Sequence, residues 1–412
     1  MNAGGLRVCV GHGRVRVPGF LSLDERDDAD VPYRAGDAFP FTDRAIEAIV
    51  VAGFDAHVHE SSLVAIALEC RRVLRVQGAV RFVMPATASA ARDARLREAV
   101  DRVARLVGLL PASNGQPPAM LDFTKPQRQA SGQPLVTIAI PAYSARFFAA
   151  ALDSALAQTY PHVEIVVCDD SSEDAIASIV AARNAELRVR YERNPVRLKG
   201  RGNYRRCLEL AHGEFLKYLN DDDVLEPDCV ARLVEAFVRV PDLALATSHR
   251  LRIDAFGSPL DDQPATRPVV DRDRIVAGPT LANAMLMAGI NFIGEPTTVL
   301  FRKGELADQA PEYFRFHGRD GRGLIDMTTW AALLMKGDAA FIAARLSRFR
   351  IHEGQQQRDP DLVQRSTIAM RGLQAEWLSL GLERCCAPDR LMVKPYGGED
   401  ADDWVSVPLA HS

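Results

Sequence analysis

The chain has 412 residues, which at roughly 150 residues per domain predicts two or three domains. Hydrophobic residues make up 47% and charged residues 25%, a composition typical of globular proteins and unlike that of disordered or fibrous ones. The 50 Lys and Arg residues against 54 Asp and Glu give a net charge of −4, which provides no support for nucleic-acid binding.

Membrane-spanning and secreted classes are also disfavoured. No apolar run approaches the ~18 residues that a membrane span requires, and the first residues resemble a strand and not a signal peptide. The 7 cysteines are scattered and form no C-x-x-C pair, which indicates buried thiols and no zinc site. We therefore expect a cytoplasmic protein, and peripheral attachment to the inner face of the membrane stays open.

Residues 1–95 alternate short apolar runs with helical stretches, which predicts a parallel α/β sheet. The segment LRVCVGHG and the following FLSLD indicate a strand, a Gly-rich turn and a strand ending at Asp24. Glycines that allow close approach, followed by an acid that bonds a ribose, are typical of nucleotide-cofactor sites.

The later segment ECRRVLRVQGAVRFVMP resembles the second half of class I S-adenosylmethionine-dependent methyltransferases. The resemblance implies a Rossmann-like domain with a cofactor pocket at Gly11, Gly13, Asp24 and Asp37. The ten residues between Gly13 and Asp24 leave no room for the family's usual first helix. We therefore favour a degenerate, structural or partner-binding domain over a working methyltransferase.

Residues 96–133 begin as a charged helix and continue into a stretch rich in Pro, Gly, Gln and Ser. This composition predicts a linker. A second βα series occupies residues 134–355. Residues 356–412 are expected to form one helix, LVQRSTIAMRGLQAEWLSLGL, and a loosely held tail.

Acidic residues follow two predicted strands of the second series. The strand VEIVVC leads into Asp169 and Asp170, and the strand EFLKYL leads into Asn220–Asp223. Ligands bind outside the carboxyl ends of strands in open α/β sheets. Adjacent carboxylates are unfavourable unless a cation neutralises them, and such oxygen ligands suit Mg²⁺ or Mn²⁺ together with a substrate's phosphates.

A solvated acidic loop is the alternative for Asp221–Asp223, because charge runs are usually surface features. The position of the run after a buried strand, with a second acid pair about 50 residues earlier, favours a ligand site. A calcium-binding EF-hand is excluded because the required glycine is missing at the sixth loop position.

The segments VTIAIPAYS, VCDDSSED and FLKYLNDDDVLEPD resemble the family 2 glycosyltransferases, which have the GT-A nucleotide-sugar-binding fold. The later segments GEPTTVLFRK, LIDMTTWAALLMKG and RFRIHEG are similar to that family in the same order. The resemblance covers residues 134–355 and implies a GT-A domain there.

The resemblance also implies roles for donor-binding residues. Pro141, Ala142 and Tyr143 would line the nucleotide, and Asp170 would contact its base, usually uracil. The metal motif, normally Asp-x-Asp, falls on Asn220-Asp221-Asp222. Asp222 would then bind the metal directly, with Asp221 near the ribose or diphosphate and Asp223 in a local capping role.

Further roles follow from the same resemblance. Asp326, in a D-x-x-x-W pattern, would be the general base that accepts the acceptor's proton, and a helix N-terminal cap is its alternative. His352 would lie near the metal and the diphosphate. Weaker candidates for contacting the diphosphate, sugar or acceptor are Arg197, Lys199, Glu295, Arg348 and Arg350.

The predicted function is a metal-dependent inverting glycosyltransferase that uses Mn²⁺ or Mg²⁺ and a nucleoside diphosphate donor, UDP-sugar in the first instance. The acceptor would be a hydroxyl group of a glycan, a lipid-linked sugar or a protein. Two alternatives remain: a bifunctional enzyme that also methylates with S-adenosylmethionine, and a non-catalytic module of polysaccharide assembly.

Overall fold

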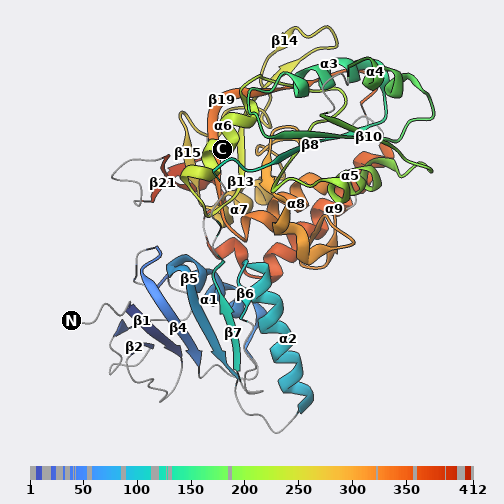
Figure 1. Ribbon diagram of the computed structural model, residues 1–412. Coiled ribbons are helices and arrows are strands. Elements are labelled where there is room, and N and C mark those ends of the chain that lie inside the picture. Colours follow the sequence, from blue (N-terminus) through green and yellow to red (C-terminus); the bar gives the residue numbers. More distant parts are fainter. Residues whose placement is uncertain are drawn as a thin grey trace. The chain divides into compact units, whose positions relative to one another are not determined.

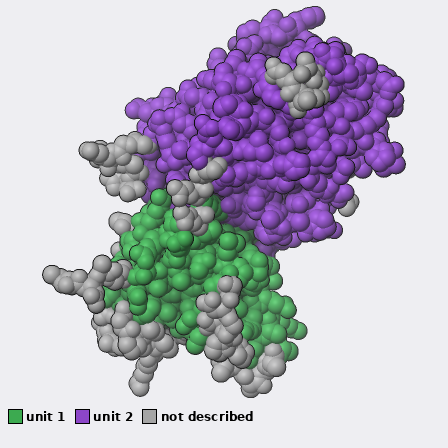
Figure 2. Space-filling model, viewed as in Figure 1, with its two compact units in different colours: residues 1–128, 376–385 green, residues 129–375, 386–412 purple. Residues whose placement is uncertain are grey.

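The computed structural model describes residues 6–409 except for 12–19, 25–30, 33–37, 40, 42, 53–57, 85–89, 113–119, 127, 129–131, 184–187, 322, 356–359, 386 and 397–403. The chain divides into two compact units, which Figure 2 shows in different colours. Unit 1 comprises residues 1–128 and 376–385, and unit 2 comprises residues 129–375 and 386–412.

Unit 1 is built on a mostly parallel sheet (Figure 1). Its described strands have the order β3-β2-β1-β4-β5-β7-β6; β7 is antiparallel to β5 and to β6, and the others are parallel. The elements are β1 (Leu6–Gly11), β2 (Leu21–Asp24), β3 (Val31–Pro32), β4 (Ile46–Ala52), α1 (Glu60–Val73), β5 (Leu74–Val83), α2 (Ala90–Leu106), β6 (Leu110–Pro111), β7 (Met120–Thr124) and the 3₁₀ helix η3 (Leu382–Cys385).

The charged helix expected at the start of residues 96–133 is part of α2, but the stretch after it, which was expected to be a linker, contains β7. β7 pairs with β5 from Ala79–Thr124 to Val83–Met120. The Phe123 ring is buried and lies edge-on to Phe82, with ring centroids 6.0 Å apart. Because this strand completes the sheet and its aromatic core, the chain as far as residue 128 belongs to unit 1.

Unit 2 contains a larger mixed sheet, whose principal order is β10-β9-β8-β11-β16-β13-β19-β15-β20-β21. Its first elements are β8 (Val136–Ala142), α3 (Ala145–Leu156), β9 (Val163–Asp169), α4 (Ala175–Arg183), β10 (Val189–Arg193), α5 (Lys199–Leu210), β11 (Phe215–Tyr218), β12 (Val224–Leu225), α6 (Cys229–Arg239), β13 (Leu243–Ile253) and β14 (Pro259–Leu260). The later elements are β15 (Arg274–Val276), α7 (Gly278–Ala288), β16 (Leu300–Arg302), η1 (Lys303–Gln309), β17 (Arg315–Phe316), β18 (Arg319–Asp320), α8 (Ile325–Leu334), β19 (Asp338–Arg350), α9 (Pro360–Ser379), β20 (Arg390–Pro395) and β21 (Val405–Pro408).

The first part of unit 2 is a parallel α/β arrangement. β10, β9, β8 and β11 are parallel neighbours, and the chain order reverses at β8 because β9 and β11 flank it on opposite sides. The apolar run of β8 is buried at every position from Val136 to Ile140, as expected for a central strand covered on both faces. The α/β class predicted from the sequence is confirmed for both units.

The helix α3 shows why the local sequence folds in this way. Ser144 caps its N-terminus by accepting the N–H of Arg146. Phe148, Leu152 and Ala155, which recur at helical spacing, are all fully buried in the core of unit 2. The helix therefore packs its apolar stripe into the core of unit 2 and begins directly after the carboxyl end of β8.

The last part of the chain was expected to be one helix and a loosely held tail, but it also contains the strands β20 and β21. β20 pairs with β15 and with β21, so it extends the sheet of unit 2. Leu391 and Val393 are buried because β20 turns these alternate side chains inward. In the part of the chain that the structure describes, no helix has both the length and the apolar character that crossing a membrane requires.

Candidate active site

The carboxyl ends of β8 and β11 meet where the strand order of unit 2 reverses. Asp221, which follows β11, accepts the backbone N–H groups of Tyr143 and Ser144 through Oδ2, at 2.7 Å each. The structure therefore brings the expected nucleotide segment and the acidic segment together. This edge of the sheet is the position where open α/β sheets bind ligands.

Asp222 and His352 contact each other. The distance from Asp222 Oδ2 to His352 Nε2 is 3.0 Å, and both side chains keep some solvent exposure, 20% and 11%. His352 follows β19, and its ring centroid lies 4.9 Å from that of Phe147 on α3. The structure thus joins two residues that are 130 positions apart and were both expected at a metal site.

These residues fit a metal ion that binds together with a diphosphate. Among the described residues, no group of three or more His, Cys, Asp or Glu side chains is arranged to hold a metal. Mg²⁺ and similar hard cations are usually held by one or two carboxylates plus substrate phosphates. Asp222 supplies one such carboxylate, with His352 beside it.

Asp223 has a structural role. Its side chain is fully buried, Oδ2 accepts hydrogen bonds from Thr297 Oγ1 at 2.6 Å and Asn220 Nδ2 at 3.1 Å, and Oδ1 accepts the N–H of Arg350 at 3.0 Å. Burial, reinforced by the charge of Asp222, raises the pKa of Asp223 well above its usual range. Asp223 was expected to have a local capping role, and in the structure its carboxylate bonds to Asn220 nearby and to two segments distant in the sequence.

Burial also raises the pKa of Asp221 to about 6, and the nearby charge of Asp222 acts in the same direction. The two backbone N–H donors oppose this shift because they stabilise the carboxylate. In the acidic segment, residues 220–223, the ionised carboxylates are therefore unfavourable unless a cation neutralises them.

Asn220 departs from the usual Asp-x-Asp motif, and its contacts explain the departure. Its amide oxygen accepts a hydrogen bond from the Tyr204 hydroxyl, and its amide nitrogen donates to Asp223. An aspartate could not make the second contact, because a carboxylate donates only when protonated. Asn220 therefore organises the acidic segment from within.

Asp170 lies at the same edge of the sheet, after β9. Its Oδ1 accepts from Asn194 Nδ2 at 2.9 Å and from the Leu198 N–H at 2.7 Å, and its Oδ2 accepts from the Lys199 N–H at 2.8 Å. The expected base-contacting residue thus binds the N-terminus of α5 in this structure, where a carboxylate is favourable.

Tyr143 and Arg197 form an exposed pair. The Arg197 guanidinium carbon lies 4.4 Å from the centroid of the Tyr143 ring, and 45% of Tyr143 is exposed. Ala142, by contrast, is buried, and its carbonyl accepts hydrogen bonds from Asp170 N and Asn203 Nδ2. Tyr143 and Arg197 therefore present an aromatic face and a positive charge to solvent at this edge, while Pro141 and Ala142 end β8.

Asp326 lies in the first turn of α8. This position agrees with the alternative considered for it, a role at the N-terminus of a helix. Its Oδ1 accepts the N–H of Met327 and its Oδ2 accepts from Asn291 Nδ2, both at 2.8 Å. Burial raises its pKa, and the nearby Glu295 charge adds to the effect. A carboxylate with a raised pKa that is held by two fixed donors is suited to accept a proton from a substrate.

Among the weaker candidates, the side chains of Glu295, Arg348 and Arg350 bind other groups of the protein. Glu295 forms an ion pair with buried Arg250, with 2.6 Å between Glu295 Oε2 and Arg250 Nε. Arg348 donates to Glu226, and Arg350 Nε donates to the carbonyl of Asp222 at 2.8 Å. These contacts hold the walls of the site together.

Sequence reasoning missed several of the residues that build the site, among them Asn291, Thr297 and Asn203. Asn203, on α5, donates to the carbonyls of Ala142 and Cys168 and is buried. It thereby joins the ends of β8 and β9. No motif marks these amides and hydroxyls, because their importance arises only from contacts between distant segments.

In unit 1, Gly11 ends β1, but its lack of a side chain serves packing. A Cβ atom at this position would lie 2.0 Å from the carbonyl oxygen of Ala52 on β4. Asp24 ends β2, while Gly13 and Asp37 lie outside the described residues.

Residues 137–294 match the sequence family Glycosyl transferase family 2. This segment carries the sequence pattern of the family 2 glycosyltransferases. The family expectation is thereby confirmed for residues 137–294, and the match supports the GT-A fold expected in unit 2.

Curated relatives agree with this family. An uncharacterized protein of Mycobacterium tuberculosis is 31% identical over 223 residues, which cover 52% of this chain and 66% of the relative. The chondroitin synthase of Escherichia coli is 32% identical over 149 residues, 35% of this chain and 21% of the synthase. An Escherichia coli UDP-Glc:alpha-D-GlcNAc-diphosphoundecaprenol beta-1,3-glucosyltransferase is 36% identical over 91 residues, 22% of this chain and 36% of that enzyme. The chain thus spans less than two thirds of each relative's length.

Among solved structures, a mannosyltransferase from Pyrobaculum calidifontis in complex with GDP-Man and Mn²⁺ matches with 16% identity and a TM-score of 0.43. The match covers 64% of this chain and 74% of the mannosyltransferase.

Proposed function

We propose that the chain is a metal-dependent inverting glycosyltransferase that transfers a sugar from a nucleoside diphosphate, in the first instance UDP, to a hydroxyl group in polysaccharide synthesis. The observation that carries this proposal is the 3.0 Å contact of Asp222 with His352 beside Asp221, at the carboxyl edge of the sheet. That edge also holds Tyr143 and Arg197, which are suited to a nucleotide.

In the proposed reaction, Asp326 accepts the proton of the acceptor hydroxyl. The hydroxyl oxygen attacks the anomeric carbon as the bond from that carbon to the diphosphate oxygen breaks, and the diphosphate leaves with the bonding electrons. A divalent cation bound by Asp222, with His352 nearby, would neutralise the charge of the leaving diphosphate. A single displacement of this kind inverts the anomeric configuration.

The relatives support the choice of donor and acceptor class. UDP-Glc is the donor named for one relative, whose acceptor is a sugar on a lipid diphosphate, and another is a chondroitin synthase. A glycan, lipid-linked or protein hydroxyl is the acceptor class that we propose. A lipid-linked acceptor would require the chain to act at the inner face of a membrane.

The test is a screen of UDP-, GDP- and dTDP-sugars for hydrolysis and transfer, with Mn²⁺, with Mg²⁺ and with a chelator. We expect one donor to be consumed only when a divalent cation is present. Absence of turnover with every donor, together with absence of Mn²⁺-dependent UDP binding in calorimetry, would refute the proposed function.

For unit 1 we propose a methyltransferase-like domain without cofactor binding, which acts as a structural or partner-binding module. The parallel order β3-β2-β1-β4-β5 reverses between β1 and β4, where an open α/β sheet would bind a ligand. At that point Gly11 packs against Ala52. Calorimetry with S-adenosylmethionine tests the proposal; binding at micromolar concentration would favour the bifunctional alternative.

A further inference from the structure

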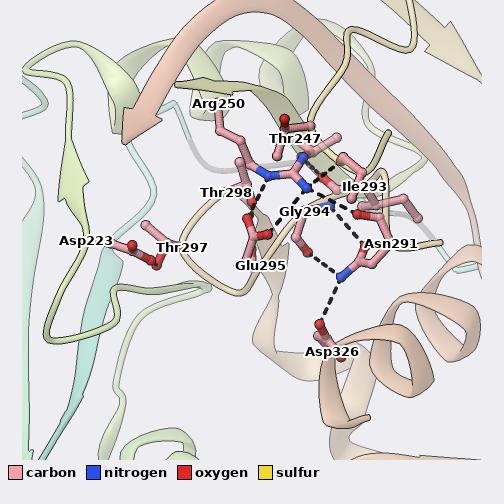
Figure 3. A network of polar contacts seen from close by, with 12 residues as sticks. Asp223, Thr247, Arg250, Asn291, Ile293, Gly294, Glu295, Thr297, Thr298 and Asp326 are labelled. Carbon is pink, nitrogen blue, oxygen red and sulfur yellow. Dashed lines mark hydrogen bonds and ion pairs between the residues drawn. The ribbon is translucent and has the colours of Figure 1, made fainter. Parts of the chain in front are cut away.

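The loop of residues 291–298 connects the acidic segment to the helix that carries Asp326 (Figure 3). At one end, Thr297 Oγ1 donates to Asp223 Oδ2 at 2.6 Å and accepts the Asn220 N–H at 3.1 Å. At the other end, Asn291 donates to Asp326, and Trp330 of α8 donates through Nε1 to the Gly294 carbonyl at 2.9 Å. The loop therefore contacts both sides of the candidate active site.

We propose that Asn291 is the positioning residue for Asp326, and that the buried Arg250–Glu295 ion pair holds Asn291 in place. This inference rests on the proposed function and names the groups that orient its base. Asn291 belongs to none of the sequence motifs from which roles in the site were expected.

The side-chain amide of Asn291 can point in only one direction. Its Oδ1 accepts the Gly294 N–H at 3.0 Å, and its Nδ2 donates to the Gly294 carbonyl at 3.0 Å. The remaining N–H is directed at Asp326 Oδ2, 2.8 Å away. Because backbone groups of Gly294 decide which end of the amide is the donor, Asp326 always meets a hydrogen-bond donor here.

Arg250 holds the loop of residues 291–298 through contacts with Asn291 and Glu295. It lies on β13 and is only 2% exposed, and Nη2 donates to the carbonyls of Ala265 at 2.6 Å and Asn291 at 3.1 Å. Its Nε pairs with Glu295 Oε2 at 2.6 Å. A buried charge pair of this kind is sensitive to loss of either partner, so the loop has one favoured position.

The arrangement has a consequence for proton transfer. Two titratable groups interact electrostatically with Asp326: Glu295 on the loop, whose charge is held by its ion pair with Arg250 on β13, and Tyr204 on α5, whose pKa is raised in part by the charge of Asp326. Loss of the Asn291 donor removes a contact that stabilises the carboxylate, so the pKa of Asp326 rises further. The carboxylate also loses its fixed orientation, which costs rate.

The experiment compares Asn291→Ala with Thr280→Ala in the full chain. Thr280 is buried on α7, where it donates to the Ala277 carbonyl at 2.9 Å and accepts the Met392 N–H at 3.3 Å, so it is a control for the loss of buried hydrogen bonds. We expect Asn291→Ala to lower kcat by roughly 10- to 100-fold with unchanged UDP affinity. The acid limb of its pH–rate profile should move to higher pH, and Thr280→Ala should change neither.

A second measurement does not depend on turnover. The carboxyl carbons of Asp are labelled with ¹³C, the Asp326 signal is assigned by its loss in Asp326→Asn, and its titration is followed by NMR. A higher titration midpoint in Asn291→Ala than in the unmodified chain supports the inference. An unchanged midpoint in folded Asn291→Ala overturns it, whereas failure of the proposed function appears separately, as absence of turnover and of UDP binding in the unmodified chain.

Discussion

The carboxylate of Asp221 accepts the backbone N–H of Tyr143 at 2.7 Å, which joins the segment after β11 to the segment after β8. The same oxygen accepts from Ser144, the residue that caps α3. One side chain therefore sets the relative positions of the expected nucleotide segment and the acidic segment. Asp222, the next residue, is therefore held in position where it contacts His352.

Asp222→Ala should weaken Mn²⁺-dependent binding of UDP at least about tenfold, because even outer partners of a metal ligand contribute 10- to 100-fold. Calorimetry with UDP, with and without Mn²⁺, measures this directly. Asp228→Ala is the matched control, since Asp228 is exposed and makes no side-chain cap of α6. Equal Mn²⁺-dependent binding by both variants would rule out Asp222 as a ligand.

Asp326→Asn should retain UDP binding and lose about 10²- to 10⁴-fold in kcat, the range expected for removal of a general base. Because the pKa of Asp326 is raised, activity of the unmodified enzyme should fall with decreasing pH while ordinary aspartates are still ionised. Asp361→Asn, which removes an acid from the first turn of α9, serves as control. Normal turnover of Asp326→Asn would mean that another group accepts the proton.

Arg197→Ala should weaken UDP binding about 5-fold, because the variant loses a positive charge at the proposed nucleotide site, and an exposed charge pair is worth up to about 1 kcal/mol. Arg205→Ala is the control, since Arg205 lies on α5 and pairs with Glu209 on the same helix. Titration of UDP in the presence of Mn²⁺ measures both. If the two variants bind UDP equally well, the Tyr143–Arg197 pair does not contact the donor.

Gly294→Ala should destabilise unit 2 by about 2 kcal/mol or more. The backbone φ of Gly294 is +123°, and an added Cβ would lie 2.0 Å from Thr298 Oγ1. Gly304→Ala is a matched control because a Cβ there meets nothing within 4 Å. Thermal unfolding compares the two, and a Gly294→Ala protein as stable as the control would show that the loop can adopt another conformation.

The stability of unit 2 should fall as the pH drops below about 6.5, in part because of His249. Burial lowers the pKa of His249, so the unfolded chain binds its proton more readily than the folded chain, and protonation favours unfolding. His249→Gln should therefore lose less stability between pH 7.5 and pH 5.5 than the unmodified protein. His162→Gln, at an exposed position, should behave like the unmodified protein; an unchanged pH dependence in His249→Gln would contradict this account.

The local pattern predicted much of the fold of unit 2. The helical spacing of apolar residues over residues 147–158 predicts a helix, and the structure has α3 there, Ala145–Leu156. The apolar run of residues 134–140 predicts a buried strand, and the structure has β8 there, Val136–Ala142. These elements have long buried runs or clear helical spacing. β7 was missed because its five residues follow a stretch rich in Pro and Gly, and only pairing with β5 makes it a strand.

The candidate site was predictable to the extent that its residues belong to family motifs. Asp222, Asp326 and His352 were expected, and the structure places Asp222 against His352. The contacts of Asn291 and Arg250 could not be predicted. They are 35 and 45 positions from their partners Asp326 and Glu295, and an amide or a buried arginine acquires its role only when the loop is folded.

The division of the chain between the units affects the order in which they can fold during synthesis. Unit 1 begins with the first strands but includes residues 376–385, where η3 packs against α1 and Leu382 is fully buried. Domains generally fold as units while the ribosome extends the chain from its N-terminus. The contact of η3 with α1 can therefore form only after nearly the whole of unit 2 has been synthesised.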